Sequence, residues 1–253
     1  MAEPKPVIIL PFDGFPSPEA IYARAQKFFA GSLAQKLVRF VKLNDGLHFS
    51  YLGPAILKKL WPIVPESVDF FIDVKIADVS ESDKNTLLHY AEYNPAIVTV
   101  TSAVSAKSLL AVKEALPNTK IALVDTLTDI SAEECMRRYR MKPARKISGA
   151  LNFFADELGD DNPIQMVVCG PKEVKELKEK FPRYEFITPS IRSPHMAKDH
   201  QARPASAYNA LSWGASYLVM GAQLTKGNPE KNISAEESQQ ITLEEIEKYF
   251  SEQ

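Results

Sequence analysis

The amino-acid sequence predicts an α/β fold, a single (β/α)8 barrel. Short runs of apolar, β-branched residues alternate with helical patterns from one end of the chain to the other. Eight such runs can be counted, which is the number of strands in this barrel. The length of 253 residues also suits it, and we expect one domain over residues 1–253.

The expected strands are continuous apolar runs, as is typical of parallel strands covered on both faces. They lie at 7–10, 40–43, 70–74, 97–100, 121–124, 166–169, 185–187 and 217–220. Between them, helical spacing of apolar residues mostly begins with Ser or Pro, which favour helix N-termini. These helices are expected at 18–30, 82–93, 106–116, 171–180 and 204–213. A charged tail from about 228 is expected to end in a short helix at 243–250.

An open, doubly wound sheet is the competing fold. Such a sheet often has a glycine-rich turn after its first strand, where it binds a dinucleotide. Here residues 11–16 read Pro-Phe-Asp-Gly-Phe-Pro, and the whole chain contains only 10 glycines and no GxGxxG motif. The closed barrel is therefore the better prediction.

The composition disfavours several classes of protein. A formal net charge of −2 provides no basic field for nucleic acid, and no apolar stretch approaches the ~18 residues of a membrane span. The four histidines form no convincing metal-binding cluster, and Cys135 and Cys169 are expected to be reduced thiols. The N-terminus lacks the pattern of a signal peptide, so a soluble cytoplasmic protein is expected.

Polar and charged residues gather where the expected strands end. Asp13 follows the first strand, Lys42 lies in the second, and Asp73 and Lys75 end the third, with Asp78 just beyond. Further polar residues follow the later strands, namely Thr101, Thr126, Thr128 and Arg192. In an α/β barrel these strand ends form a single rim, which is where active sites are built.

Asp73 and Lys75 are two residues apart in a strand, so their side chains are expected on the same face. An acid and a base that face inward together are costly to bury unless they pair with each other and with further charges. Lys42 and Asp78 can supply those charges. We therefore expect an alternating Lys–Asp–Lys–Asp chain, in which the carboxylates favour the charged form of the lysines.

The D-x-K-x-x-D pattern of Asp73, Lys75 and Asp78 resembles the signature of the orotidine 5'-monophosphate decarboxylase superfamily. Sugar-phosphate lyases share this pattern, and the flanking segments narrow the choice. Similar segments occur in the family's order at 41–49, 53–56, 188–192 (Thr-Pro-Ser-Ile-Arg), 199–203 (Asp-His-Gln-Ala-Arg) and 214–221 (Gly-Ala-Ser-Tyr-Leu-Val-Met-Gly). The resemblance covers about residues 7–230, and the last three segments favour the orotidine branch.

The resemblance implies roles for five residues at the reacting end of the substrate. Asp13 would hold the ribose, and Lys42 would join the charged network. Asp73 would lie against the substrate carboxylate, and Lys75 would donate a proton to C6. Asp78 would be contributed across a dimer interface to the neighbour's site.

Five more residues would bind the base, ribose and phosphate. Ser82, where the family more often has threonine, would lie near the phosphate and ribose, and Thr128 would bond to the pyrimidine edge. Arg192 and Gln201 would serve the phosphate and a loop at 193–203 that closes over the site. Gly221 would present a backbone N–H to the phosphate at a helix N-terminus.

The resemblance thus implies a decarboxylase of pyrimidine biosynthesis. It would convert orotidine monophosphate to uridine monophosphate and CO2 without a metal or cofactor, as a homodimer with shared sites and with no nucleic-acid or membrane partner. Two alternatives remain open. One is a metal-dependent sugar-phosphate lyase of the same superfamily, and the other is a nucleotide-binding barrel without catalytic activity.

The sequence departs from the family pattern at the phosphate site. Ala222 stands where the family has a phosphate-binding arginine after the glycine aligned with Gly221, while Thr101 replaces a common histidine and Ser190 a glycine. Losing a charged hydrogen-bonding partner costs roughly 1.5–3 kcal/mol per bond. An engineered deletion, a compensating cation and a changed substrate all remain open as explanations. The candidate compensating cations are Lys226, Lys198 and His195.

Overall fold

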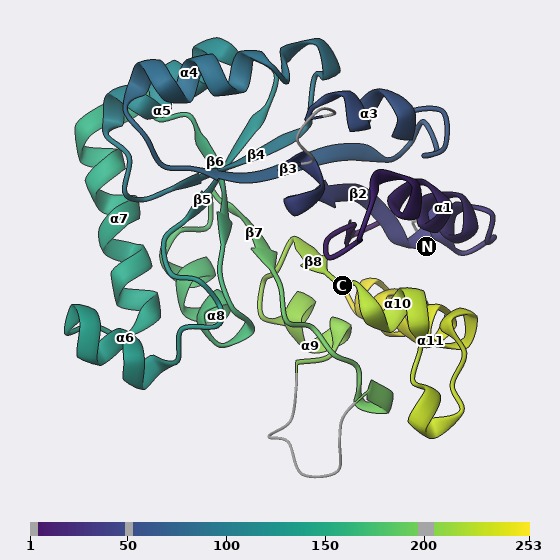
Figure 1. Cartoon of the computed structure of the whole chain (residues 1–253). Helices are drawn as coiled ribbons and strands as arrows, with labels where there is room; N and C mark the ends of the chain where they lie inside the picture. The colour runs from purple at the N-terminus through teal and green to yellow at the C-terminus, as the bar shows by residue number, and fades with distance from the viewer. Residues whose placement is uncertain (1–4, 49–52, 197–204) are drawn as a thin grey trace.

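The computed structural model describes residues 5–48, 53–196 and 205–253. Its eight parallel strands form a closed barrel in sequence order, with helices packed around the outside (Figure 1). The barrel closes where Ile8 and Ile9 pair with Leu218 and Val219, so the predicted fold is confirmed. The strands are β1 (Ile8–Pro11), β2 (Val38–Leu43), β3 (Asp69–Ile76), β4 (Ile97–Thr101), β5 (Lys120–Val124), β6 (Ile164–Val168), β7 (Glu185–Thr188) and β8 (Tyr217–Val219).

The helices follow the strands in alternation. Those in the described residues are α1 (Pro18–Phe29), α2 (Ala34–Leu37), α3 (Ala55–Leu60), α4 (Ser80–Leu88), α5 (Ala106–Ala115), α6 (Ala132–Tyr139), α7 (Pro143–Leu158), α8 (Pro171–Lys180), α9 (Ala207–Ser212), α10 (Ala222–Lys226) and α11 (Ala235–Ser251). Serine caps begin several of them, and Ser17 Oγ, for example, accepts a hydrogen bond from the Ala20 N–H at 3.3 Å. The expected Ser and Pro signals therefore do mark helix starts.

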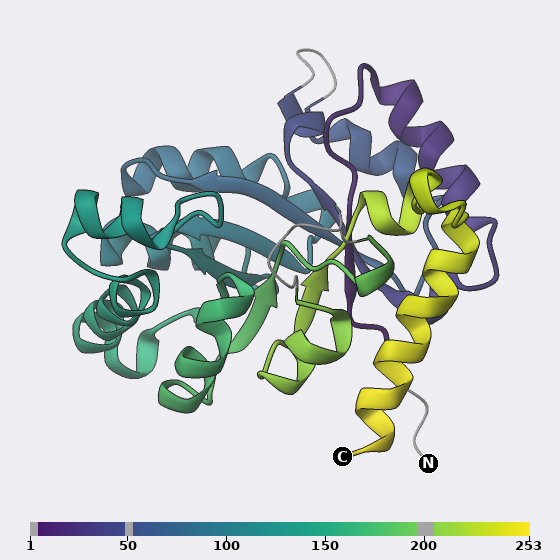
Figure 2. The ribbon, with the colours of Figure 1, turned by 90° about the horizontal axis from the view of Figure 1, so that it is seen from below.

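Several helices differ from the sequence prediction, and the long helices α7 and α11 are the clearest cases. The 16-residue α7 was not expected, although its buried Ile147, Leu151 and Phe154 recur at helical spacing. The C-terminal helix α11 has 17 residues rather than the expected eight, because Ser234 caps its first turn. Since α11 packs along α9 and α10, it closes the outside of the barrel next to β8 (Figure 2).

A layer of apolar side chains fills the barrel interior. Seven strands each contribute one buried residue to it: Ile9, Phe40, Phe71, Ile97, Ala122, Met166 and Ile187. A larger core lies between the strands and the surrounding helices. Because inward-facing side chains recur every two residues, the next inward layer lies two residues further along each strand, towards the carboxyl ends. That next layer holds the candidate site.

No helix among residues 5–48, 53–196 and 205–253 is long and apolar enough to cross a membrane.

Candidate active site

The charged residues of the site lie in the inward layer directly above the apolar one. Lys42 on β2 and Asp73 on β3 each follow an inner-layer phenylalanine by two residues. Thr99 on β4 follows Ile97 in the same way. The strand period of two therefore places a lysine, an aspartate and a threonine side by side on three neighbouring strands.

Four charged side chains form a continuous chain of ion pairs. Asp13, just after β1, pairs with Lys42. Lys42 Nζ also lies 2.9 Å from Asp73 Oδ2, and Lys75 Nζ lies 2.8 Å from Asp73 Oδ1. Asp73 is thus held between two ammonium groups, one on each carboxylate oxygen. The predicted pairing of Asp73 with Lys75 and Lys42 is present.

Thr99 and Asn44 support this chain, and the sequence reasoning missed both. Thr99 Oγ1 donates to Asp73 Oδ1 at 2.9 Å and accepts from the Lys75 N–H at 2.9 Å. Asn44 Nδ2 donates to the Asp73 carbonyl oxygen at 2.5 Å, and its own N–H donates to Asp13 Oδ1 at 3.0 Å. Thr99 could have been recognised because it is a polar residue inside an apolar strand.

The backbone at Lys75 is not that of a regular strand. Its φ is 50°, in the left-handed region that non-glycine residues rarely adopt, and the register between β3 and β4 shifts between Ile72 and Ile76. Backbone strain of this kind is found at functional sites, where the surroundings over-determine it. Here the hydrogen bond from the Lys75 N–H to Thr99 fixes the unusual conformation.

Lys42 is buried but remains charged. Its side chain is 10% exposed. Burial alone would lower its pKa, but attraction to Asp73 and Asp13 outweighs that effect and raises the pKa of Lys42 above its usual 10.5. Lys42 therefore keeps its positive charge near neutral pH.

A cavity of about 190 Å³ opens above the charged residues. Lys42, Asp73 and Lys75 line one side of it. The other lining residues are mostly apolar: Phe71, Val124, Thr126, Leu127, Thr128, Val168, Ile187, Pro189 and Val219. A small planar group could therefore rest on an apolar wall with one edge facing the ion pairs.

Asp78 and Ser82 lie outside this cavity. Asp78 is exposed and in no ion pair within the described chain; its N–H donates to Asp83 Oδ1 at 3.0 Å, and its Oδ1 accepts from the Val79 N–H at 2.7 Å. Ser82 is half-buried in α4. The expected four-charge chain is therefore completed within the described chain by Asp13 rather than by Asp78.

The remaining expected substrate contacts are spread along the rim. Thr128 lines the cavity, and Arg192 is exposed in the segment after β7, where its N–H donates to the Ala205 carbonyl oxygen at 3.0 Å. Gly221 begins α10, where an added Cβ would approach Pro11 Cγ to 3.0 Å. Gln201 lies outside the described residues.

The structure bears on three of the departures from the family pattern. Ser190 has a φ of 64°, a conformation that glycine adopts without strain. The hydroxyl of Thr101 is buried without a hydrogen-bond partner. Ala222 and Lys226 are both exposed in α10.

His195 is a poor candidate for the compensating cation. Its Nε2 lies 2.7 Å from Ser238 Oγ on α11. Burial, followed by the charge of Lys231, lowers the pKa of His195 below its usual 6.5, so its imidazole is neutral at neutral pH. Another candidate, Lys198, lies outside the described residues.

Within residues 5–48, 53–196 and 205–253, no group of three or more His, Cys, Asp or Glu side chains is arranged to hold a metal ion.

The class of protein is therefore an α/β barrel with buried charges at the carboxyl ends of its strands, the place where barrels of this kind build their active sites. No protein-family model matches the chain. The orotidine 5'-phosphate decarboxylase of Thermobifida fusca is 31% identical over 200 residues, which cover 78% of this chain and 82% of that protein. That of Listeria innocua is 28% identical over 232 residues, covering 88% and 93%. The chain belongs to the orotidine 5'-phosphate decarboxylase family.

Solved structures agree on the fold. The crystal structure of orotidine 5'-phosphate decarboxylase from Lactobacillus acidophilus superposes with a TM-score of 0.71 at 21% identity, covering 96% of this chain and 99% of that one. An uncharacterised conserved protein from Geobacillus kaustophilus has a TM-score of 0.69 at 20% identity, covering 94% and 99%.

Proposed function

We propose that this protein decarboxylates orotidine 5'-monophosphate to uridine 5'-monophosphate and CO2. The observation that carries the proposal is the ion-pair chain Asp13–Lys42–Asp73–Lys75 at one side of an otherwise apolar cavity. Buried charges cost free energy, and clusters of them in a cavity are typical of functional sites. The named activity of the relatives supports the same reaction.

The difficult step is breaking the bond between C6 and the carboxylate carbon, because its electron pair stays on C6, where no adjacent group delocalises it. The ammonium of Lys75 offsets that developing negative charge and then donates a proton to C6, while CO2 departs. The main catalytic contribution is that Lys75 is already oriented before the substrate binds, because Thr99 holds its backbone N–H and Asp73 holds its ammonium group. Repulsion between Asp73 and the substrate carboxylate contributes less.

The rim would bind the rest of the nucleotide. Thr128 faces the cavity from the β5 side and would bond to the pyrimidine edge, while Asp13 would bind the ribose. The Arg192 side chain and the Gly221 backbone would bind the phosphate. Gln201 keeps the role in phosphate binding that the resemblance gives it.

We propose further that the active form is a homodimer with shared sites. Asp78 and Ser82 lie outside the cavity of their own chain, and Asp78 is exposed. Val79 beside them is 66% exposed, which is unusual for a large apolar residue and fits burial against a second subunit. Asp78 would then enter the neighbour's site next to Lys75, completing the alternation of charges.

An ultraviolet assay of orotidine monophosphate loss tests the proposed reaction, with a chelator present throughout. We expect turnover by the unaltered protein and a loss of several powers of ten in Lys75→Ala, because that variant lacks the proton donor. Circular dichroism would check that the variant is folded. Retention of roughly a tenth of the turnover would refute the role of Lys75.

The same assay separates the two alternatives. A metal-dependent sugar-phosphate lyase would leave orotidine monophosphate unchanged and would lose its own activity in chelator. A non-catalytic barrel would bind uridine monophosphate without turning over orotidine monophosphate. Position 222 is an exposed alanine instead of the family's phosphate-binding arginine, which weakens the expected phosphate site. Nucleotide binding should therefore be measured separately from turnover.

A further inference from the structure

Gln223 is a buried polar residue that the proposed mechanism does not use. It stands in α10 directly after Ala222, and only 4% of it is exposed. Its Oε1 accepts from the Ser193 N–H at 3.0 Å, and its Nε2 donates to Ser193 Oγ at 2.9 Å and to Thr242 Oγ1 at 3.0 Å. One side chain thus holds both the backbone and the hydroxyl of Ser193.

The same serine is also bound by Glu245 on α11. Ser193 Oγ donates to Glu245 Oε2 at 3.1 Å, and this oxygen also accepts from the Ala207 N–H at 2.9 Å. Ser193 lies within the connection from β7 to α9, and Ala207 is the first residue of α9. The Glu245 carboxylate oxygen therefore joins the first part of that connection to the start of α9, and Gln223 joins the same part to α10.

These contacts lie beside both expected phosphate-binding groups. Arg192 precedes Ser193, and Gly221 lies two residues before Gln223. The two hydrogen bonds between Gln223 and Ser193 therefore connect the residue after Arg192 to the helix that follows Gly221. With no arginine at position 222, the phosphate depends on those two groups being correctly spaced, because backbone donors alone cannot replace a bidentate guanidinium.

We propose that Gln223 is a positioning residue for the phosphate end of the substrate, acting through Ser193 on Arg192. This inference rests on the proposed function. Gln223 touches no substrate, since its side chain is buried between Ser193 and Thr242. It acts by fixing the spacing of two binding groups, so it should affect affinity for phosphate-bearing ligands more than the chemical step.

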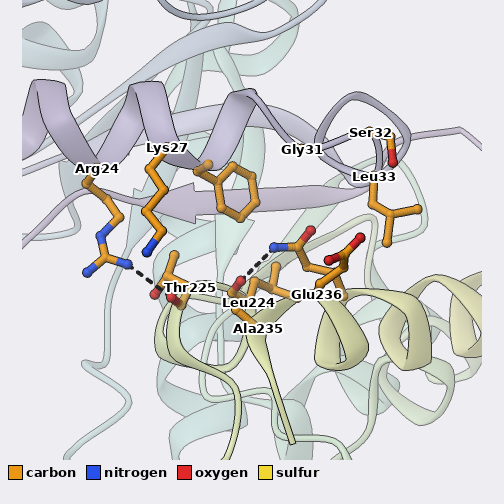
Figure 3. A pocket seen from close by; sticks show the side chains of 11 residues that line it. Arg24, Lys27, Gly31, Ser32, Leu33, Leu224, Thr225, Ala235 and Glu236 are labelled. Carbon is orange, nitrogen blue, oxygen red and sulfur yellow. Dashed lines mark hydrogen bonds between the residues drawn. The ribbon is translucent and has the colours of Figure 1, made fainter.

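The chain offers a matched control in a second buried glutamine that donates a hydrogen bond to α10. Gln239 on α11 is 8% exposed, and its Nε2 donates to the Leu224 carbonyl oxygen at 2.8 Å. Arg24 on α1 donates to the neighbouring Thr225 carbonyl oxygen at 3.0 Å (Figure 3). A change at Gln239 therefore removes a buried amide contact with α10 but leaves the contacts of Ser193 intact.

The test compares Gln223→Met with Gln239→Met, because methionine keeps the length of glutamine but not its hydrogen bonds. For Gln223→Met we expect KM for orotidine monophosphate and Kd for uridine monophosphate to rise about tenfold, or about 1.4 kcal/mol. The value of kcat should change less than about twofold, and binding of phosphate-free uridine should be unchanged. For Gln239→Met we expect none of these values to move.

A second variant covers the case in which Gln223→Met does not fold. Ser193→Ala removes the hydroxyl but keeps the N–H that bonds to Gln223, so it should raise the same KM and Kd by a smaller factor. An unchanged KM in folded Gln223→Met, or equal weakening of uridine and uridine monophosphate, would overturn this inference alone. An unaltered protein that neither binds uridine monophosphate nor turns over orotidine monophosphate would overturn the proposed function as well.

Discussion

Replacing Lys42 with methionine would test the ion-pair chain most directly. Methionine preserves the aliphatic stem but removes the ammonium that lies between Asp13 and Asp73. In the unaltered protein, the formal charges of Asp13, Lys42, Asp73 and Lys75 cancel. Without the Lys42 ammonium, the other three side chains carry one uncompensated negative charge. We expect the variant to fold with a clearly lower free energy of unfolding.

The structure sets the size of the effect. Asp73 has an 11% exposed side chain and cannot recover the lost contact from water, whereas Asp13 at 33% can do so in part. Removing one partner from a buried pair costs about 3–5 kcal/mol. Because Lys75 and Thr99 still bind Asp73, the loss should fall near the lower end, about 3 kcal/mol.

Urea unfolding at neutral pH would measure this loss, with Lys42→Met/Asp73→Asn as the matched comparison. The double variant removes the stranded charge, so it should regain part of the stability that Lys42→Met loses. A loss below about 1 kcal/mol in Lys42→Met would refute the reasoning, because it would mean that the contacts of Lys42 are those of an exposed surface pair.

Three further predictions follow from the structure. Mixing Lys75→Ala with Asp78→Ala chains should restore activity to about a quarter of the sites if sites are shared between two subunits, and a fully active monomer in sedimentation would rule this out. Ala222→Arg should lower KM and raise kcat/KM, whereas a neutral Ala222→Arg beside a severely weakened Lys226→Ala would show that the lysine compensates. Burial raises the pKa of Glu245 above its usual 4.5, so the native protein loses stability as pH rises from 4.5 through that raised pKa. Glu245→Gln should not show this loss, and parallel stability–pH curves for the two proteins would contradict the assignment.

The barrel could be predicted because its strands carry an unambiguous local signal. Residues 97–100 and 121–124 are wholly buried β-branched or apolar runs, and the structure places both in strands. The helix α7 was missed because Gly149 and the paired Phe153 and Phe154 weaken its pattern, and only packing against the barrel shows which phenylalanine is buried. Local signals identify strands well but do not show which helical face the fold covers.

The candidate site was predictable to the extent that it lies on regular strands. Asp73 and Lys42 project inward because of the strand period, and their contact follows from it. The Asp13–Lys42 pair was missed because Asp13 follows β1 in a loop, where sequence gives no direction for a side chain. The contacts of Gln223 were missed for a related reason, since they join segments that only the tertiary fold brings together.

The two ends of the candidate site differ in how they can attract a nucleotide. At the reacting end two lysines and two aspartates balance, so this end favours a particular geometry but does not attract an anion over distance. A phosphate must therefore be attracted at the rim, where Arg192 is exposed and His195 is neutral. If, as proposed, separate groups carry chemistry and anchoring, changes at Gln223 should alter affinity, and changes at Lys75 should alter turnover. The contrary result would be that variants at Gln223 and at Lys75 lower kcat by similar factors. That result would mean that phosphate binding lowers the barrier of the chemical step itself, so that the two ends of the site are coupled.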